Sequence, residues 1–269
     1  MKVLFEYSEG CQKHINQDCY GYKDNIFWVI DGATDVFGKN YFSASGDVYW
    51  VVQQLNQELH NGDTSLALKE YVRSAIDKVN SNAESLSPLI HDIPPNFLPT
   101  YSICCVRYEK NLLEYLCLGD CSVFVSNSPL TRYTDERIYP FHLAVNKVKN
   151  QYCKDVNLYH TEVLKKVREI KQYINIKDGY WIGTLDANVI DHAIFGKISI
   201  QPNERFLICS DGFRPSIDES QLVSFNPNEI FNIQSLQKIL KRQNISESDY
   251  YSKTGIDISD DKTVLLIKA

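Results

Sequence analysis

Four short aspartate-bearing segments carry the groups of this chain that are best suited to chemistry. They are Asn16-Gln17-Asp18, Val29-Ile30-Asp31-Gly32, Ile208-Cys209-Ser210-Asp211-Gly212 and Ser259-Asp260-Asp261. Each segment borders a short apolar, β-branched or aromatic run of the kind that forms strands. We therefore expect the carboxylates to lie at strand ends, where they would form a cage for hard divalent cations, which prefer oxygen ligands.

A cage of this kind suits two-metal hydrolysis. Two Mg²⁺ or Mn²⁺ ions held ~3.5–4 Å apart share a bridging carboxylate and a bridging water, and that water attacks phosphorus in line near neutral pH. Asp31 is the candidate for the bridging carboxylate. The reason is Gly32, whose carbonyl can approach a metal with no Cβ in the way. The sequence thus predicts Mn²⁺ or Mg²⁺ as the cofactor, as two ions.

The composition narrows the class of protein. The 269 residues are 43% hydrophobic and 23% charged, as in an ordinary globular protein with a substantial core, and we expect one domain over residues 1–269 and a monomer. The formal net charge of −6 argues against a nucleic-acid partner, which normally requires clustered Lys and Arg. No apolar stretch approaches the ~18–20 residues that span a membrane, so no membrane association is expected.

Cysteine usage indicates the redox compartment. Eight cysteines occur, without a CxxC pair and mostly inside apolar runs, where free Cys behaves as a small buried hydrophobe. This pattern predicts reduced thiols in a cytoplasmic protein. A zinc site built from Cys117 and Cys121 with a distant histidine is disfavoured, because no second ligand pair has the required spacing.

The order of the elements predicts the fold class. Strands are expected at 2–7, 19–22, 26–30, 101–108, 112–118, 122–125, 195–200, 204–209 and 263–267, with 195–200 and 204–209 forming a hairpin around Gln201-Pro202-Asn203. Helices are expected at 41–59, from an N-cap at Ser65 to about 79, and at 136–151, 157–174 and 228–242. Strands and helices do not alternate as in βαβ units. The sequence therefore predicts an α+β fold with antiparallel sheets flanked by helix layers.

Five ordered motifs resemble a known family. Ser8-x₄-Lys13-x₂-Asn16-Gln17-Asp18, VIDGATD, LGDCS, LICSDGF and ISDDKTVLL, with GYWIGTLD before LICSDGF, are similar to the metal-dependent protein phosphatases, the type 2C serine/threonine phosphatases, in their bacterial form. The resemblance spans nearly the whole chain. It implies a four-layer α-β-β-α sandwich of two antiparallel sheets flanked by helix pairs. It also implies a hydrolase whose metal-bridging hydroxide attacks phosphoserine or phosphothreonine of a phosphoprotein, with a cognate Ser/Thr kinase as a further partner.

The resemblance also implies roles for the matched residues at the metals. Asp31 bridges both ions and the carbonyl of Gly32 binds the second one. Asp211 and Asp260 bind the first ion.

The amino-terminal motif departs from the family's pattern. The family's carboxylate for the second metal falls on neutral Gln17, which implies a weaker second site. Asp18 either contacts a metal through water or hydrogen-bonds the first loop. The basic residue that grips the substrate phosphate matches Lys13, which offers a point charge instead of the bidentate fork of arginine.

Two further departures concern the acid and a third metal. Ala33 replaces the general-acid histidine of eukaryotic members, so protonation of the leaving group would fall to water, to His14 or to no group at all. The family's optional third metal matches Asp120 and a position taken here by Pro215, so a third metal is not expected unless Asp218 substitutes, and Asp120 is then only a turn residue.

These departures favour an alternative, a pseudophosphatase that binds or regulates without efficient turnover. An aspartyl-phosphate hydrolase of the haloacid dehalogenase type is disfavoured, because the chain lacks the Asp-x-Asp pair on the strand that ends at Asp31.

Overall fold

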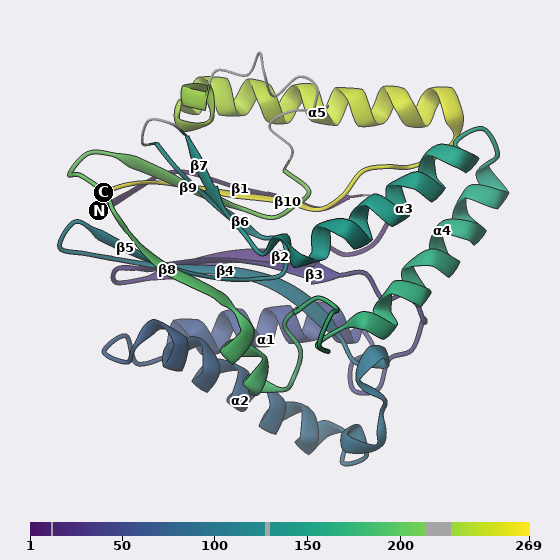
Figure 1. Ribbon diagram of the computed structural model, residues 1–269, viewed down its shortest axis with the longest axis horizontal. Coiled ribbons are helices and arrows are strands. Elements are labelled where there is room, and N and C mark those ends of the chain that lie inside the picture. The colour runs from purple at the N-terminus through teal and green to yellow at the C-terminus, as the bar shows by residue number, and fades with distance from the viewer. Residues whose placement is uncertain (12, 127–129, 214–226) are drawn as a thin grey trace.

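The computed structural model describes residues 1–11, 13–126, 130–213 and 227–269, and the account below concerns these residues. Two antiparallel sheets of five strands stack face to face (Figure 1). Sheet A has the strand order β1-β10-β9-β6-β7 and sheet B the order β2-β3-β4-β5-β8. Sheet A therefore joins the two ends of the chain, since β1 pairs with β10.

The strands and helices have the following bounds. Sheet A contains β1 (Lys2–Glu9), β6 (Ser122–Val125), β7 (Thr131–Tyr133), β9 (Arg205–Cys209) and β10 (Lys262–Lys268). Sheet B contains β2 (Asp18–Lys23), β3 (Ile26–Ala33), β4 (Thr100–Glu109), β5 (Leu112–Leu118) and β8 (Ile194–Ser199). The α-helices are α1 (Asp47–Asn61), α2 (Leu68–Leu86), α3 (Tyr139–Tyr152), α4 (Val156–Ile170) and α5 (Ile233–Thr254).

The helices build the outer layers. α1 and α2 cover the outer face of sheet B, and α5 lies over the outer face of sheet A (Figure 1). This arrangement confirms the predicted α-β-β-α order. The prediction of a helix pair over each sheet differs from the structure, because α5 is the one described α-helix over sheet A. The second pair, α3 and α4, forms a helical hairpin beside one end of the sheets (Figure 1).

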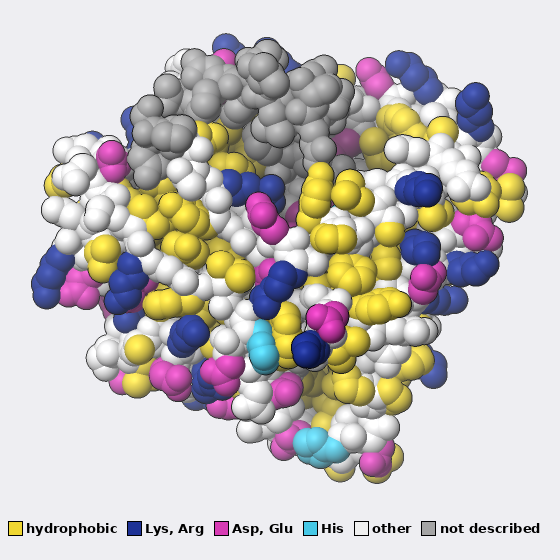
Figure 2. Space-filling model, viewed as in Figure 1, with side chains coloured by type: hydrophobic (Ala, Val, Ile, Leu, Met, Phe, Trp, Pro, Cys, Tyr) yellow, Lys and Arg dark blue, Asp and Glu magenta, His cyan; other side chains and the backbone are white. Residues whose placement is uncertain are grey.

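The α3–α4 hairpin is peripheral for a simple reason of packing. α3 contains no fully buried residue, and α4 buries only Tyr159 and Ile170. Hydrophobic side chains gather on the visible face of this hairpin (Figure 2). Tyr139, Leu143 and Leu158 are among the exposed hydrophobic residues of its two helices. Neither helix buries a continuous row of side chains against a sheet.

Alternation along β3 divides the core and positions the site. Ile26, Trp28 and Ile30 pack toward α1 and α2, whereas Phe27 and Val29 pack in the core between the sheets. Because successive side chains of a strand point to opposite faces, Asp31 continues the Phe27 and Val29 series. Its carboxylate is thus placed between the sheets, at the end of the strand.

The predicted hairpin of 195–200 with 204–209 is wrong. β8 pairs with β5 in sheet B, and β9 pairs with β6 and β10 in sheet A. The short Gln201-Pro202-Asn203 connection instead passes from one sheet to the other. Ile200 N donates to Asn111 O, next to β5 of sheet B, and Asn203 N donates to Ala269 O, next to β10 of sheet A. The backbone on the two sides of the turn is therefore hydrogen-bonded to different sheets.

Several helix boundaries also differ from the prediction, among them the start of α1 at Asp47, where the sequence predicted 41. Ser65 is not an N-cap, because its backbone N and its Oγ both donate to Asp63 Oδ1, and α2 begins at Leu68. α5 begins after the Asn232 cap and continues to Thr254, well beyond the predicted end. Its last three turns are largely polar, so apolar periodicity did not reveal them. No helix among the described residues is long and apolar enough to cross a membrane.

Candidate metal centre

β2 and β3 bring two carboxylates directly opposite each other. Asp18 pairs with Asp31 in the antiparallel register, and Gly32 N donates to Gln17 O at 3.2 Å in the adjacent pair. Hydrogen-bonded and non-hydrogen-bonded pairs alternate in such a ladder, so Asp18 and Asp31 form the non-bonded type, in which side chains approach most closely. Like charges directly opposite destabilise a sheet. The pairing therefore favours the binding of a cation between the carboxylates of Asp18 and Asp31.

Asp18 is a buried carboxylate without a hydrogen-bond donor among the described residues. It is 4% exposed, and neither of its carboxylate oxygens has a partner. Burial raises its pKa to about 8; the nearby hydroxyls of Ser210 and Thr263 lower it, and the charges of Asp261 and Asp211 raise it. Those hydroxyls lie outside hydrogen-bond geometry with Asp18. Ser210 Oγ accepts from Thr263 N, and Thr263 Oγ1 and Ser8 Oγ share a hydrogen bond.

Asp31 is the electrostatic centre of the cluster. Burial raises its pKa well above the usual value, and four other carboxylates raise it further, namely Asp18, Asp211, Asp120 and Asp260. Asp18 and Asp31 belong to strands of sheet B, whereas Asp120 follows β5, Asp211 follows β9 and Asp260 precedes β10. Such a group of acids cannot all ionise in close proximity unless cations compensate the charge. The structure thus brings the predicted ligands Asp18, Asp31, Asp211 and Asp260 together.

Two glycines permit the close backbone approaches of the site. A Cβ on Gly32 would lie 2.7 Å from Val48 Cγ1 and 2.9 Å from Gln17 O, and a Cβ on Gly212 would collide with the carbonyl oxygen of Asp261. Neither position therefore tolerates a side chain without a shift of its neighbours. Gly212 lets the Asp211 turn pack against the residues that precede β10.

Asp261 fastens the loop between β1 and β2 to the start of β10. It is 5% exposed, its Oδ1 accepts from Cys11 N at 2.7 Å, and its Oδ2 accepts from Gln17 N at 2.7 Å. The tandem aspartates thus differ in their contacts. Asp261 is engaged with the backbone of the loop, and Asp260 Oδ1 accepts from Asp261 N at 3.1 Å.

Gln17 offers the second orphaned acceptor. Its Oε1 is buried without a hydrogen-bond partner among the described residues. Together with the two Asp18 oxygens, it gives a set of oxygen donors that suits a hard divalent ion. The residues present therefore fit Mg²⁺ or Mn²⁺.

Lys13 belongs to the loop between β1 and β2, and its side chain contacts the loop that precedes β10. Its Nζ donates to Ser259 O at 2.5 Å and lies 4.0 Å from Asp257 Oδ1. The side chain is 41% exposed, so it remains accessible to a ligand. The contacts of Lys13 in the structure are with residues 257–259 and not with the aspartate cluster.

The structure adds residues that the sequence did not single out. Ser102 Oγ donates to Asp120 Oδ1 at 2.6 Å, and His142 Nε2 of α3 lies 3.3 Å from Asp120 Oδ2. No local spacing links these three residues, so nothing in the sequence signals their meeting. Of the residues considered for a third metal, Pro215 and Asp218 lie outside the described part of the chain.

Comparisons with known proteins give a likeness in structure alone. No family model matches the sequence, and no curated protein sequence matches it significantly. Solved structures do match over almost the full length of both chains. They include the PPM Ser-Thr phosphatase MsPP from Mycobacterium smegmatis in complex with cacodylate, at 15% identity and a TM-score of 0.55, with 99% of each chain covered.

Two further structures show the same likeness. Serine/threonine phosphatase Stp1 from Staphylococcus aureus is 14% identical with a TM-score of 0.56, covering 100% of this chain and 96% of its own. The catalytic domain of PstP in complex with two manganese ions is 16% identical with a TM-score of 0.53, and the match covers 98% of this chain and 97% of that domain. At these identities the likeness establishes the fold, which is the fold of bacterial serine/threonine phosphatases, as the motifs predicted.

Proposed function

We propose that this chain is a metal-dependent phosphoprotein phosphatase that hydrolyses phosphoserine and phosphothreonine. The observation that carries the proposal is the cross-strand pair Asp18–Asp31, which faces the space between the sheets, with Asp18 buried and both of its carboxylate oxygens lacking a donor among the described residues. Such a pair is costly unless a cation binds there. The fold supports the same activity, because the similar structures are named serine/threonine phosphatases, one of them holding two manganese ions.

The ligands proposed for two Mn²⁺ or Mg²⁺ ions are all oxygen donors. Asp31 would be shared by both ions, and Asp211 and Asp260 would complete the first position. The Gly32 carbonyl, with Gln17 and Asp18 directly or through water, would complete the second. When bound, such ions supply a water-derived nucleophile at neutral pH and neutralise charge on the phosphoryl oxygens.

The protein's own residues hold these groups and receive the phosphate. The strand ends of β2 and β3 fix Asp18 and Asp31, and Asp261 fixes the loop that leads to them through its bonds to Cys11 N and Gln17 N. The exposed ammonium of Lys13 is proposed to bind a phosphate oxygen, exchanging its bond to Ser259 O for a charge-assisted one. No leaving-group acid is assigned.

The substrate and setting follow from the same proposal. A phosphoprotein is the expected substrate and a Ser/Thr kinase the expected counterpart. All eight cysteines are free in the structure, which supports a reducing, cytoplasmic setting.

The test is hydrolysis of a phosphothreonine peptide by the purified protein with and without Mn²⁺. We expect Mn²⁺-dependent release of phosphate that Asp31→Asn and Asp211→Asn abolish while circular dichroism shows an intact fold. Full manganese-dependent activity in either variant would rule out the proposed centre.

A second candidate function is a pseudophosphatase that binds phosphoproteins without efficient turnover. Two observations favour it: Gln17 is neutral where the second ion would need a charge, and Lys13 already bonds Ser259 O. Calorimetric titration with Mn²⁺ separates the candidates. Uptake of two ions supports the enzyme, whereas uptake of fewer, together with peptide binding but no hydrolysis, supports the binding module.

A further inference from the structure

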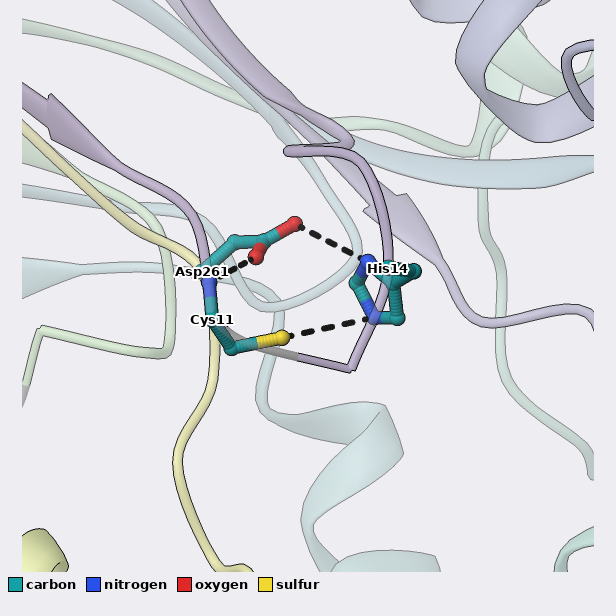
Figure 3. Close-up of side chains that lie close together, drawn as sticks. All are labelled: Cys11, His14 and Asp261. Atoms are coloured by element: carbon teal, nitrogen blue, oxygen red, sulfur yellow. Dashed lines mark hydrogen bonds and ion pairs between the residues drawn. The ribbon is translucent and has the colours of Figure 1, made fainter.

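Three side chains with different donor atoms converge beside the aspartate cluster. Cys11 and His14 lie in the loop between β1 and β2, and Asp261 immediately precedes β10 (Figure 3). Cys11 Sγ is 3.6 Å from His14 Nε2, and His14 Nδ1 is 3.7 Å from Asp261 Oδ2. One ligand atom from each residue lies within 4.8 Å of the other two. The imidazole thus stands between a thiol and a carboxylate.

The hydrogen bonds of His14 orient its ring as a ligand. Nδ1 lies 2.9 Å from the carbonyl oxygen of Ile15, which can only accept, so Nδ1 carries the proton. Nε2 is then the nitrogen with the free lone pair, and it faces Cys11 Sγ. Histidines that bind metals commonly donate their other N–H to a backbone carbonyl in this way.

Asp261 is already held in place before any ion binds. Its two oxygens accept from Cys11 N and Gln17 N, at 2.7 Å each. Each carboxylate oxygen has a second lone pair, so these bonds leave room for coordination. Because the bond from Cys11 N and the thiol of Cys11 belong to one residue, the carboxylate and the sulfur are kept near each other.

The donor set selects a class of metal. Thiolate with imidazole and carboxylate is typical of zinc-class ions, whereas Mg²⁺ and Mn²⁺ prefer oxygen alone. Tetrahedral bonds of ~2.0–2.3 Å separate ligand atoms by roughly 3.3–3.7 Å. The sulfur–nitrogen distance of 3.6 Å already meets this requirement. The three ligand atoms lie within 4.8 Å of one another, and binding of one ion requires a rotation of the half-buried side chains of Cys11 and His14 that brings the carboxylate to this spacing.

We propose that Cys11, His14 and Asp261 form a binding site for one zinc-class divalent ion, separate from the oxygen-lined centre around Asp31. The Cys11 thiol gives its proton to solvent as its sulfur binds the ion, and water takes the fourth position. The bound ion would link the β1–β2 loop to the start of β10. Since Lys13 lies between two of the ligands in sequence, its segment would be held more rigidly.

The first test uses Co²⁺ as a spectroscopic substitute for zinc, added to the full-length protein in excess Mg²⁺. Thiolate ligation gives a sulfur-to-cobalt charge-transfer absorption that oxygen ligands do not give. We expect this band to saturate at one Co²⁺ per chain and to be displaced by Zn²⁺. Cys11→Ala should abolish the band, His14→Asn should weaken Co²⁺ binding at least roughly tenfold, and Cys153→Ala, at the other half-buried cysteine, should change nothing.

The second test needs no variant and so does not depend on whether Cys11→Ala folds. Zn²⁺ should slow the alkylation of Cys11 by iodoacetamide, read peptide by peptide by mass spectrometry, and leave the rate at Cys153 unchanged. Absence of the cobalt band, its persistence in Cys11→Ala, or equal alkylation of Cys11 with and without Zn²⁺ would overturn the proposal. All these readouts are independent of phosphatase activity.

Discussion

Asp18 lies directly opposite Asp31 across the β2–β3 ladder, with both side chains directed between the two sheets. Two acids in a non-hydrogen-bonded pair violate the usual preference for compatible cross-strand partners. Natural sequences keep such local conflicts mainly at functional positions. On the proposed function, the pair lowers the stability of the metal-free protein and is compensated when a cation binds, and the predictions below follow from this explanation.

Removing one acid of the pair should stabilise the metal-free protein. At alkaline pH we expect Asp31→Asn to raise the free energy of unfolding of the metal-free protein by about 0.5–1 kcal/mol, because it removes the like-charge neighbour of Asp18. The same variant should lose the stabilisation by Mn²⁺, which for the wild type reaches about 2.7 kcal/mol at one hundred times the dissociation constant. Urea unfolding with and without Mn²⁺ measures both effects. Asp249→Asn, on the exposed surface of α5, is the matched control and should change neither the stability of the metal-free protein nor its stabilisation by Mn²⁺. A metal-free Asp31→Asn protein that is less stable than the metal-free wild type would contradict the explanation.

The stability of the metal-free protein should fall as pH rises. The pKa of Asp18 is about 8 in the fold against 3.8 for the free group, so the folded state binds more protons between these values. Its stabilising effect is complete below the lower pKa and lost as pH rises through the upper one, with a slope of at most roughly 1.4 kcal/mol per pH unit for one proton. Unfolding followed from mildly acidic to alkaline pH measures this decline. Asp18→Asn should flatten it, as should saturating Mg²⁺; an unchanged slope in Asp18→Asn would assign the effect to another group.

Restoring a carboxylate at position 17 should strengthen the second metal position. Gln17 Oε1 is buried and unpartnered among the described residues, so Gln17→Glu places a charge where an acceptor already points. We expect the weaker Mn²⁺ dissociation constant in calorimetry to fall roughly tenfold. Gln17→Ala, which lacks the oxygen, should weaken the same step. Equal affinities in all three proteins would show that residue 17 does not face an ion.

Lys13 should act on substrate binding. In Lys13→Ala we expect KM for a phosphothreonine peptide to rise roughly tenfold, since a hydrogen bond to a charged group contributes about 1.5–3 kcal/mol, while Mn²⁺ affinity stays unchanged. Lys13→Arg keeps the charge and should retain most of the affinity for substrate. Steady-state kinetics and calorimetry on the same preparations provide both values. A KM unaffected in Lys13→Ala would leave Lys13 with only its contacts to Ser259 and Asp257.

Much of the site could be predicted because its parts are local. Each aspartate motif borders its own strand, and strands are recognisable from short apolar runs. The Asp18–Asp31 pairing also follows from the sequence once the turn between the two strands is located. The tight turn at Asp24 and Asn25 sets Lys23 opposite Ile26, and counting outward from that pair places Asp18 opposite Asp31.

Other features depend on contacts that local patterns do not encode. β8 and β9 are neighbours in sequence but join different sheets, because their partners are decided by long-range pairing. His142 meets Asp120 only through the packing of α3 at the end of the sheets. Cys11 and His14 reach Asp261 only because β1 pairs with β10. In each case the decisive partner lies far away in the chain.

The most direct measurement of the central claim, that Asp31 is shared by two divalent ions, is the anomalous diffraction of crystals soaked in Mn²⁺ without zinc. We predict two manganese peaks ~3.5–4 Å apart on either side of the Asp31 carboxylate, and no pair of peaks in crystals of Asp31→Asn. Wild-type crystals without manganese at Asp31, or an unchanged pair of peaks in Asp31→Asn, would contradict it.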